Sequence, residues 1–186
     1  MTVVDEDLEP VLVSCGNEDV DVIAVQTKVG NNRIRVINGY GPQEDEDKQQ
    51  LLNFWHEIEK EVISAKDNGC MMIMEMDANA KVGREVIAND PHNQTNNGKI
   101  LVDMVSRNNL VIANALDICK IEKSAIDYVI ICRELYKYLI GMNIDEERFH
   151  VLTNYRRNKS TKKSITSDHN ILYCNFSLSF SRHRGK

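Results

Sequence analysis

Three acidic residues stand at or near the ends of apolar, strand-like runs of the sequence. Asp77 ends "CMMIMEMD", Asp127 lies in "SAIDYVIICREL", and Asp168 precedes "HNILYCNFSLSF". A lone carboxylate in such a run is costly to bury unless it is paired or holds a cation. Asn79 follows the first of these acids two positions on, and His169 comes directly after the last. These residue types suggest a site rather than a set of isolated charges.

An Asp, an Asn, a second Asp and an Asp-His pair would suit metal-assisted attack on a phosphate. One carboxylate would activate water, an amide would orient it, and carboxylates would hold a hard divalent cation, while an imidazole would stabilise charge on a phosphoryl oxygen. Along an extended chain the side chains of Asp77 and Asn79 point the same way. Spacing alone leaves a structural alternative open, in which these two residues make a turn and Asp127 caps a strand.

The first part of the chain predicts a hairpin followed by a helix. Strand-like runs begin at residues 20 and 33, and Gly30 with the two Asn after it suits a hairpin turn. The acids of "QEDED" are expected in the first helical turn. Apolar residues then recur at three- and four-residue steps from Leu51 to Ala65, with Trp55 in the core, and Asn68-Gly69 suits a helix end.

The rest of the chain alternates strand and helix signals. A strand ending at Asp77 is followed by a polar loop over residues 81–97, a short helix over 99–108 and a strand over 109–114. The loop holds His92, where a substrate could pass, although a surface histidine without a role is the plainer interpretation. Lys99 and the Asn-rich stretch before it could also contact phosphate. The alternation predicts a single α/β layered domain over residues 1–186.

Composition and charge limit the class of protein. The chain has 186 residues, 42% of them hydrophobic, with no apolar run long enough to span a membrane. Acids occupy the first ten residues where a signal peptide carries bases, so an intracellular protein, nuclear or cytoplasmic and not secreted, is expected. The net charge is −5, but nine Lys/Arg and one acid lie from residue 148 onward. This basic segment suits phosphate binding, and a solvated loop explains it equally well.

Four short motifs resemble one superfamily, in the same order along the chain. They are "NGYGPQ", "MDANAKVG", "AIDYVII" and "SDHNIL". They resemble the Asn-x-Tyr-x-Pro, Gly-Asp-Phe-Asn-Ala-Lys-Val-Gly, Ile-Asp-Tyr-Val and Ser-Asp-His motifs of the endonuclease/exonuclease/phosphatase superfamily. The resemblance is greatest to the endonuclease domains of non-LTR retrotransposons, including those in craniofacial-development-protein-like reading frames. It implies a two-sheet α/β sandwich.

The resemblance assigns roles at the first two motifs. Tyr40 would lie near the scissile phosphate. Asp77 would be the base that activates the attacking water, and Asn79 would position that water and the phosphate.

It also assigns roles at the last two motifs. Asp127 would orient His169, which would stabilise the developing negative charge. Asp168 would ligate Mg²⁺ or Mn²⁺. The implied function is divalent-metal-dependent hydrolysis of phosphodiester bonds in nucleic acid, with DNA the expected substrate and the oligomeric state left open.

Two departures keep alternatives open. Met76 and Ala78 replace the Gly and Phe that flank the Asp in the family motif, and neither replacement removes a chemical group. The family's opening strand, helix and metal-binding Glu have no match before Val20, so a sandwich lacking its first strands is expected. A catalytically impaired relic or interaction module with the same fold is one alternative, and a small-molecule or lipid phosphatase is the other.

Overall fold

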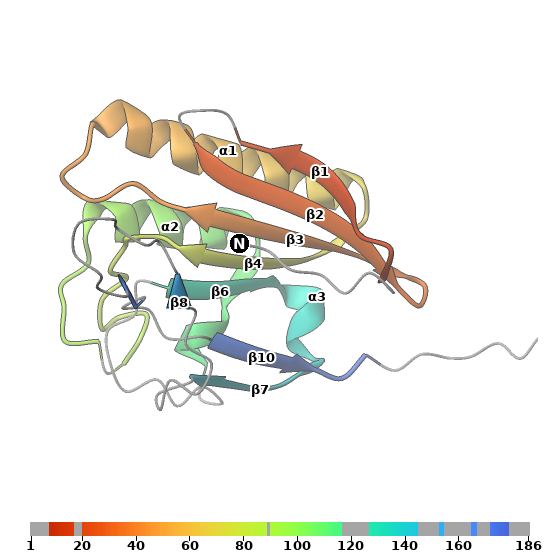
Figure 1. Cartoon of the computed structure of the whole chain (residues 1–186). Coiled ribbons are helices and arrows are strands. Elements are labelled where there is room, and N and C mark those ends of the chain that lie inside the picture. Colours follow the sequence, from red (N-terminus) through yellow and green to blue (C-terminus); the bar gives the residue numbers. More distant parts are fainter. Residues whose placement is uncertain are drawn as a thin grey trace, which may run out of the picture.

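A six-stranded mixed sheet forms the centre of the molecule (Figure 1). The computed structural model describes residues 8–16, 20–88, 90–116, 127–144, 153–154, 165–166 and 172–178. The strands of the large sheet are β1 (Val11–Cys15), β2 (Asp21–Val29), β3 (Asn32–Tyr40), β4 (Met71–Asp77), β5 (Leu110–Ile112) and β6 (Asp127–Cys132). Their order is β1-β2-β3-β4-β6-β5, in which only β3 and β4 run parallel.

The predicted hairpin is confirmed as β2 and β3. The two strands pair in register from Asp21↔Tyr40 to Val29↔Asn32, and Gly30 takes a φ of 62° in the turn between them. Strand β1 was not predicted, because its short run "VLVSC" shows no alternation of polar and apolar residues. It lies at the edge of the sheet, where Val11 and Leu12 are exposed.

Two long helices cover one face of the large sheet (Figure 1). They are α1 (Lys48–Asp67) and α2 (Asn96–Arg107), and the described chain also forms the short helices η2 (Ala113–Ala115) and α3 (Arg133–Tyr136). Helix α1 starts later than expected, because the Asp47 side chain accepts a hydrogen bond from the Gln49 N–H at 2.6 Å and caps it. The other acids of "QEDED" therefore precede the helix. Helix α2 starts earlier than expected, with Thr95 as its cap.

The core lies between these helices and the sheet. Trp55 and Ile58 of α1 are buried, as the helical pattern predicted for this face, and Phe54 is buried beside them. On β4, every second residue from Met72 to Met76 is buried on the same side. Because side chains alternate across a strand, Met71, Ile73, Glu75 and Asp77 lie on the opposite face of the sheet.

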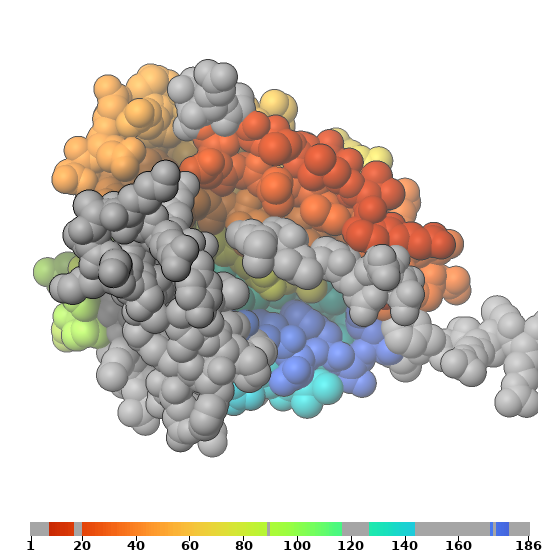
Figure 2. Space-filling view, viewed as in Figure 1, coloured from red at the N-terminus to blue at the C-terminus, as the bar shows by residue number. Residues whose placement is uncertain are grey.

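Two small sheets complete the described structure. β7 (Leu139–Ile144) pairs with β10 (Leu172–Phe176), and β8 (Thr153–Asn154) pairs with β9 (Ile165–Thr166). The β7–β10 sheet buries Met142, and Leu172, Cys174 and Phe176 pack partly against the main core. Figure 2 shows this sheet, in cyan and blue, on the same side of the molecule as β1 and β2 in red. The predicted α/β fold with a mixed sheet and a second sheet is confirmed. None of the described helices is long and apolar enough to cross a membrane.

A buried ionic contact joins β3 to α1. Arg35 is only 2% exposed, and its guanidinium donates to Glu61 Oε2 at 3.1 Å and to Gln26 Oε1 at 3.0 Å. The Glu61 side chain is 12% exposed. Removing one partner of a buried pair leaves the other charge without compensation.

Replacing Glu61 with alanine will therefore destabilise the protein by about 3–5 kcal/mol, measured by urea unfolding. Glu57→Ala, one turn earlier on α1, is the matched control. Glu57 binds Lys60 in an exposed pair, so its loss will cost less than about 1 kcal/mol. Equal effects of the two substitutions would contradict a structural role for the buried pair.

Candidate active site

One row of residues crosses the end of the large sheet. Tyr40 pairs with Asp77 on the parallel neighbour, and Asp77 pairs with Asp127 on the antiparallel neighbour. Paired residues on adjacent strands are roughly 5 Å apart and project to the same face. Tyr40 is 53% exposed, and both aspartates are half-buried. The register thus brings together three residues that are far apart in the sequence, on the face away from α1 and α2.

The turn after β4 is fixed to the loop after β3. The Gly41 N–H donates to the Asp77 carbonyl at 2.7 Å, and the Asn79 side chain donates from Nδ2 to the Gly41 carbonyl at 2.8 Å. A Cβ atom on Gly41 would lie 2.8 Å from the Ala78 carbonyl oxygen, so only glycine fits this approach. The two segments that carry the row are therefore held together by their backbones.

The expectation that Asp77 and Asn79 project in parallel along an extended chain was wrong. Strand β4 ends at Asp77, and Asn79 adopts a left-handed φ of 43°, which asparagine tolerates. The Asn79 backbone N–H donates to Asp77 Oδ1 at 3.1 Å. The turn that spacing left open as an alternative is thus present, and it orients the Asp77 carboxylate at the edge of the row.

A buried asparagine at the start of α2 supports this turn from behind. Asn97 is fully buried; its Oδ1 accepts from the Trp55 indole at 2.7 Å, and its Nδ2 donates to the carbonyls of Pro42 and Asn79 at 3.0 and 3.4 Å. The suggested phosphate contact is wrong for Asn97, because its polar atoms are used inside the protein. An Asn-rich run before a helix is compatible both with a phosphate contact and with a buried structural role, so the sequence does not distinguish them.

The other end of the row is held by Asn114. Its side chain accepts from the Val129 N–H at 2.8 Å and donates to the Asp127 carbonyl at 3.0 Å. Asn114 is 3% exposed and follows β5, so it fixes where β6 begins. This contact places Asp127 opposite Asp77.

A further acid lies on the same face, one step behind the row. Glu75 precedes Asp77 by two positions on β4 and pairs with Asn38 and Val129. Its side chain is exposed, although neighbouring atoms partly desolvate the carboxyl group, and this desolvation raises its pKa above the ordinary value. Sequence reasoning did not single out Glu75, although the strand alternation that pairs it with Asp77 was available.

The oxygens of the row are of the type that Mg²⁺ and Mn²⁺ prefer. Within the described residues, however, no three His, Cys, Asp or Glu side chains are grouped closely enough to hold a metal ion. The predicted ligand Asp168, its neighbour His169 and the basic segment 156–163 lie outside the described residues. The carboxylate oxygens of the row fit such a cation in donor chemistry.

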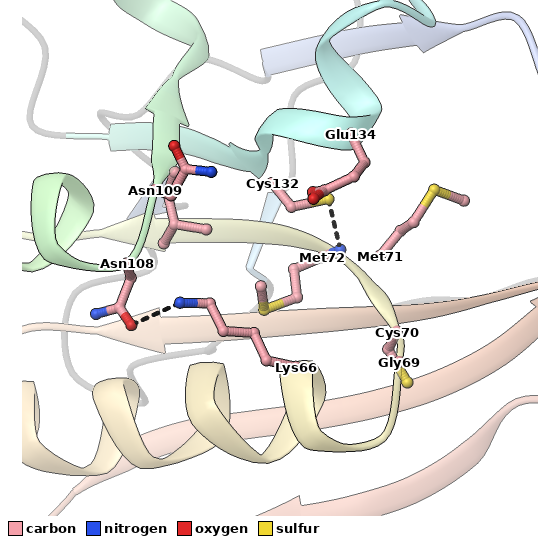
Figure 3. A pocket seen from close by; sticks show the side chains of 10 residues that line it. Lys66, Gly69, Cys70, Met71, Met72, Asn108, Asn109, Cys132 and Glu134 are labelled. Carbon is pink, nitrogen blue, oxygen red and sulfur yellow. Dashed lines mark hydrogen bonds between the residues drawn. The ribbon is translucent and has the colours of Figure 1, made fainter.

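A cavity of about 440 Å³ lies at the opposite end of the sheet (Figure 3). Residues from the start of β4, the end of β6 and the ends of α1 and α2 line it. There the Lys66 ammonium donates to Asn108 Oδ1 at 2.9 Å, and the Cys132 sulfur accepts from the Met72 N–H at 3.3 Å. Burial raises the pKa of the Cys132 thiol, which keeps it protonated and a poor nucleophile. The cavity is therefore separate from the row and lacks an activated group.

Comparison with known proteins identifies the fold. No protein-family model matches the chain, and no curated protein matches its sequence. Solved structures, a retrotransposon endonuclease domain among them, do match its fold, which is the α/β architecture with a second sheet that the sequence motifs implied.

Three of these structures show the extent of the similarity. The endonuclease domain of TRAS1, a telomere-specific non-LTR retrotransposon, is 15% identical with a TM-score of 0.64, covering 95% of this chain and 72% of that one. A 3′ phosphatase from Neisseria, NExo, bound to a product DNA hairpin, is 14% identical with a TM-score of 0.59, covering 84% and 65%. The Xenopus laevis APE2 catalytic domain is 18% identical with a TM-score of 0.53, covering 84% and 57%. The match thus spans 72%, 65% and 57% of the lengths of these three structures, respectively.

Trp55→Phe tests the support behind the turn. The substitution keeps a buried ring but removes the donor to Asn97 Oδ1, so it will cost about 1–3 kcal/mol of stability. Hydrogen exchange will also speed up at residues 79–83, because that segment loses its anchor. Unchanged unfolding and unchanged exchange would mean that the hydrogen bond contributes nothing to the turn.

Glu75→Gln tests the desolvated acid through pH. Because folding raises the pKa of Glu75, its charged form opposes folding, and stability is lost as pH rises from the unfolded value of 4.5 through the folded one. The glutamine variant will therefore melt at a higher temperature than the parent at about pH 7.5 and at the same temperature near pH 3. Glu85→Gln, an exposed loop substitution, is the charge control. If the melting temperatures of the variant and the parent differed by the same amount at every pH between about 3 and 7.5, ionisation of Glu75 would not be coupled to stability.

Proposed function

We propose that this chain is a divalent-metal-dependent nuclease that hydrolyses phosphodiester bonds in nucleic acid, as an endonuclease of the retrotransposon type. The single observation that carries the proposal is the row of Tyr40, Asp77 and Asp127 at one end of the sheet. The fold shared with TRAS1, NExo and APE2 supports the same reaction class. DNA is the proposed substrate, because the NExo structure holds a DNA product.

Each described residue has a role in the proposed reaction. The Asp77 carboxylate, oriented by the Asn79 backbone N–H, takes a proton from the attacking water. The exposed phenol of Tyr40 contacts the scissile phosphate, and Asn79 holds the turn and positions the water. Asp127 orients His169, whose imidazole stabilises the charge that develops on the phosphoryl oxygen.

Magnesium or manganese would be held by Asp168. Such a cation supplies charge stabilisation for the phosphoryl group. The register of β3, β4 and β6 determines the positions of Tyr40, Asp77 and Asp127 relative to one another. Asn114 determines where β6 starts. We propose an intracellular site of action, nuclear or cytoplasmic.

Asp77→Asn is the direct test. The amide keeps the shape of the side chain but cannot take a proton, so the rate of nicking supercoiled plasmid with Mg²⁺ or Mn²⁺ will fall by about 10²-fold or more. Asp103→Asn, on the exposed side of α2, will nick at the parent rate. Removing the metal with EDTA will stop nicking by the parent protein.

The outcomes separate the competing functions. If the parent protein does not nick DNA with either metal, the same fold serves as an interaction module or is a relic. If it releases phosphate from a small phosphomonoester or a lipid headgroup and leaves DNA intact, it is a phosphatase. Equal nicking by the parent and by Asp77→Asn would remove Asp77 from the mechanism.

A further inference from the structure

A buried carboxylate holds an exposed imidazole in the loop that follows β4. The Asp90 side chain is fully buried, and its Oδ1 accepts from both the backbone N–H and the ring Nδ1 of His92, at 2.9 and 3.2 Å. Its Oδ2 accepts from the Gly83 N–H at 3.3 Å. The His92 side chain remains 42% exposed. The contact therefore holds Nδ1 of His92 against Asp90, while part of the ring remains exposed to solvent.

This loop is anchored at the end of the sheet that carries the row (Figure 1). Lys81 and Thr95 close its base: the Thr95 N–H donates to the Lys81 carbonyl at 3.0 Å, and the Lys81 N–H donates to Thr95 Oγ1 at 3.2 Å. Lys81 lies four positions after Asp77, and Asn97 ties the other end of the loop to the Asn79 carbonyl. Both ends of the loop are thus fixed to the segment that follows Asp77.

The charges of Asp90 and Asp127 both act on the phenol of Tyr128. The Tyr128 hydroxyl donates to the Ala80 carbonyl at 3.0 Å. Burial raises the pKa of Tyr128 above its ordinary range; the negative charges of Asp90 and Asp127 raise it further, against a hydrogen bond from the Val82 backbone. Both carboxylates therefore act on one group at this end of the sheet.

We infer that the His92 imidazole contacts a backbone phosphate of the nucleic-acid substrate beside the one that is cleaved. The inference rests on the proposed function and adds a substrate contact to it. Glu75, Asp77 and Asp127 make the face of the row acidic, so a polyanion needs donors next to it. The charged imidazole donates from both nitrogens, so Nδ1 can bind Asp90 while Nε2 binds a phosphate oxygen.

A contact to a flanking phosphate contributes to binding rather than to the chemical step. His92→Ala will therefore raise KM with little change in kcat. The buried Asp90 carboxylate loses the ring contact but keeps the backbone N–H groups of His92 and Gly83, and urea unfolding of the variant verifies that it is folded. Substituting a residue that only supports the fold would not raise KM while leaving kcat nearly unchanged. His56→Ala, an exposed histidine on α1, is the matched control and will leave both constants unchanged.

The contact can be identified by a double-mutant cycle in which His92 of the protein and one phosphate of the DNA are altered singly and together. In the Asp77→Asn background, which keeps the DNA intact, duplexes carrying one neutral methylphosphonate at successive positions are titrated by fluorescence anisotropy with Mg²⁺. With His92 present, one position next to the cleavage site will weaken binding about tenfold. With His92→Ala, binding to unmodified DNA will be about tenfold weaker, and the methylphosphonate at that position will cause no further loss.

The outcomes of this cycle are distinct from those of the nicking test. Three results would overturn the inference. The losses of affinity from His92→Ala and from the methylphosphonate could be additive at every position, His92→Ala could bind DNA as tightly as the protein with His92, or neither protein could bind the duplex. Coupling at one position in a protein that does not nick DNA would support the phosphate contact and refute the proposed catalysis.

Discussion

The register of β3, β4 and β6 is the constraint on which the candidate site depends. Side chains alternate across a strand, so a slip of one residue would turn Asp77 into the helix-covered face and Met76 out of the core. The buried methionines of β4 against α1 oppose that slip, because it would expose them and bury a carboxylate. The free energy of core packing thus holds the acids on the open face.

Polar contacts then convert this register into a defined edge. Gly41 and Asn79 join the loop after β3 to the turn after β4, and Asn114 joins β5 to the start of β6. Asn97 links the turn to α1 and α2 through Trp55 and Pro42. The buried side chains of Asn97 and Asn114 have their partners inside the protein, so these two asparagines stabilise the geometry and are not available to a substrate.

Local patterns predicted what depends on neighbours in sequence. The hairpin, helix α1 with its end at Asn68, and the strand ending at Asp77 followed from turn residues and apolar spacing. The pairing of Asp77 with Asp127 could not follow in this way, because fifty residues separate them and only the folded sheet joins them. Spacing left the turn at Asn79 open only as an alternative, and the burial of Asn97 was missed, for the same reason. Both are decided by the Gly41 carbonyl and the Trp55 indole, which belong to distant segments.

The place of β6 between β4 and β5 has a consequence for how the molecule assembles. Strands β2 to β4 and helix α1 form a continuous stretch, so they can fold as soon as residue 77 has left the ribosome. The outer edge of β4 then remains without its neighbour until Asp127–Cys132 has been synthesised, an interval of seconds at roughly 5–20 residues per second. During that time an apolar, methionine-rich edge is open to strands from other nascent chains. Slow translation between β4 and β6 will therefore lower the soluble yield of this protein.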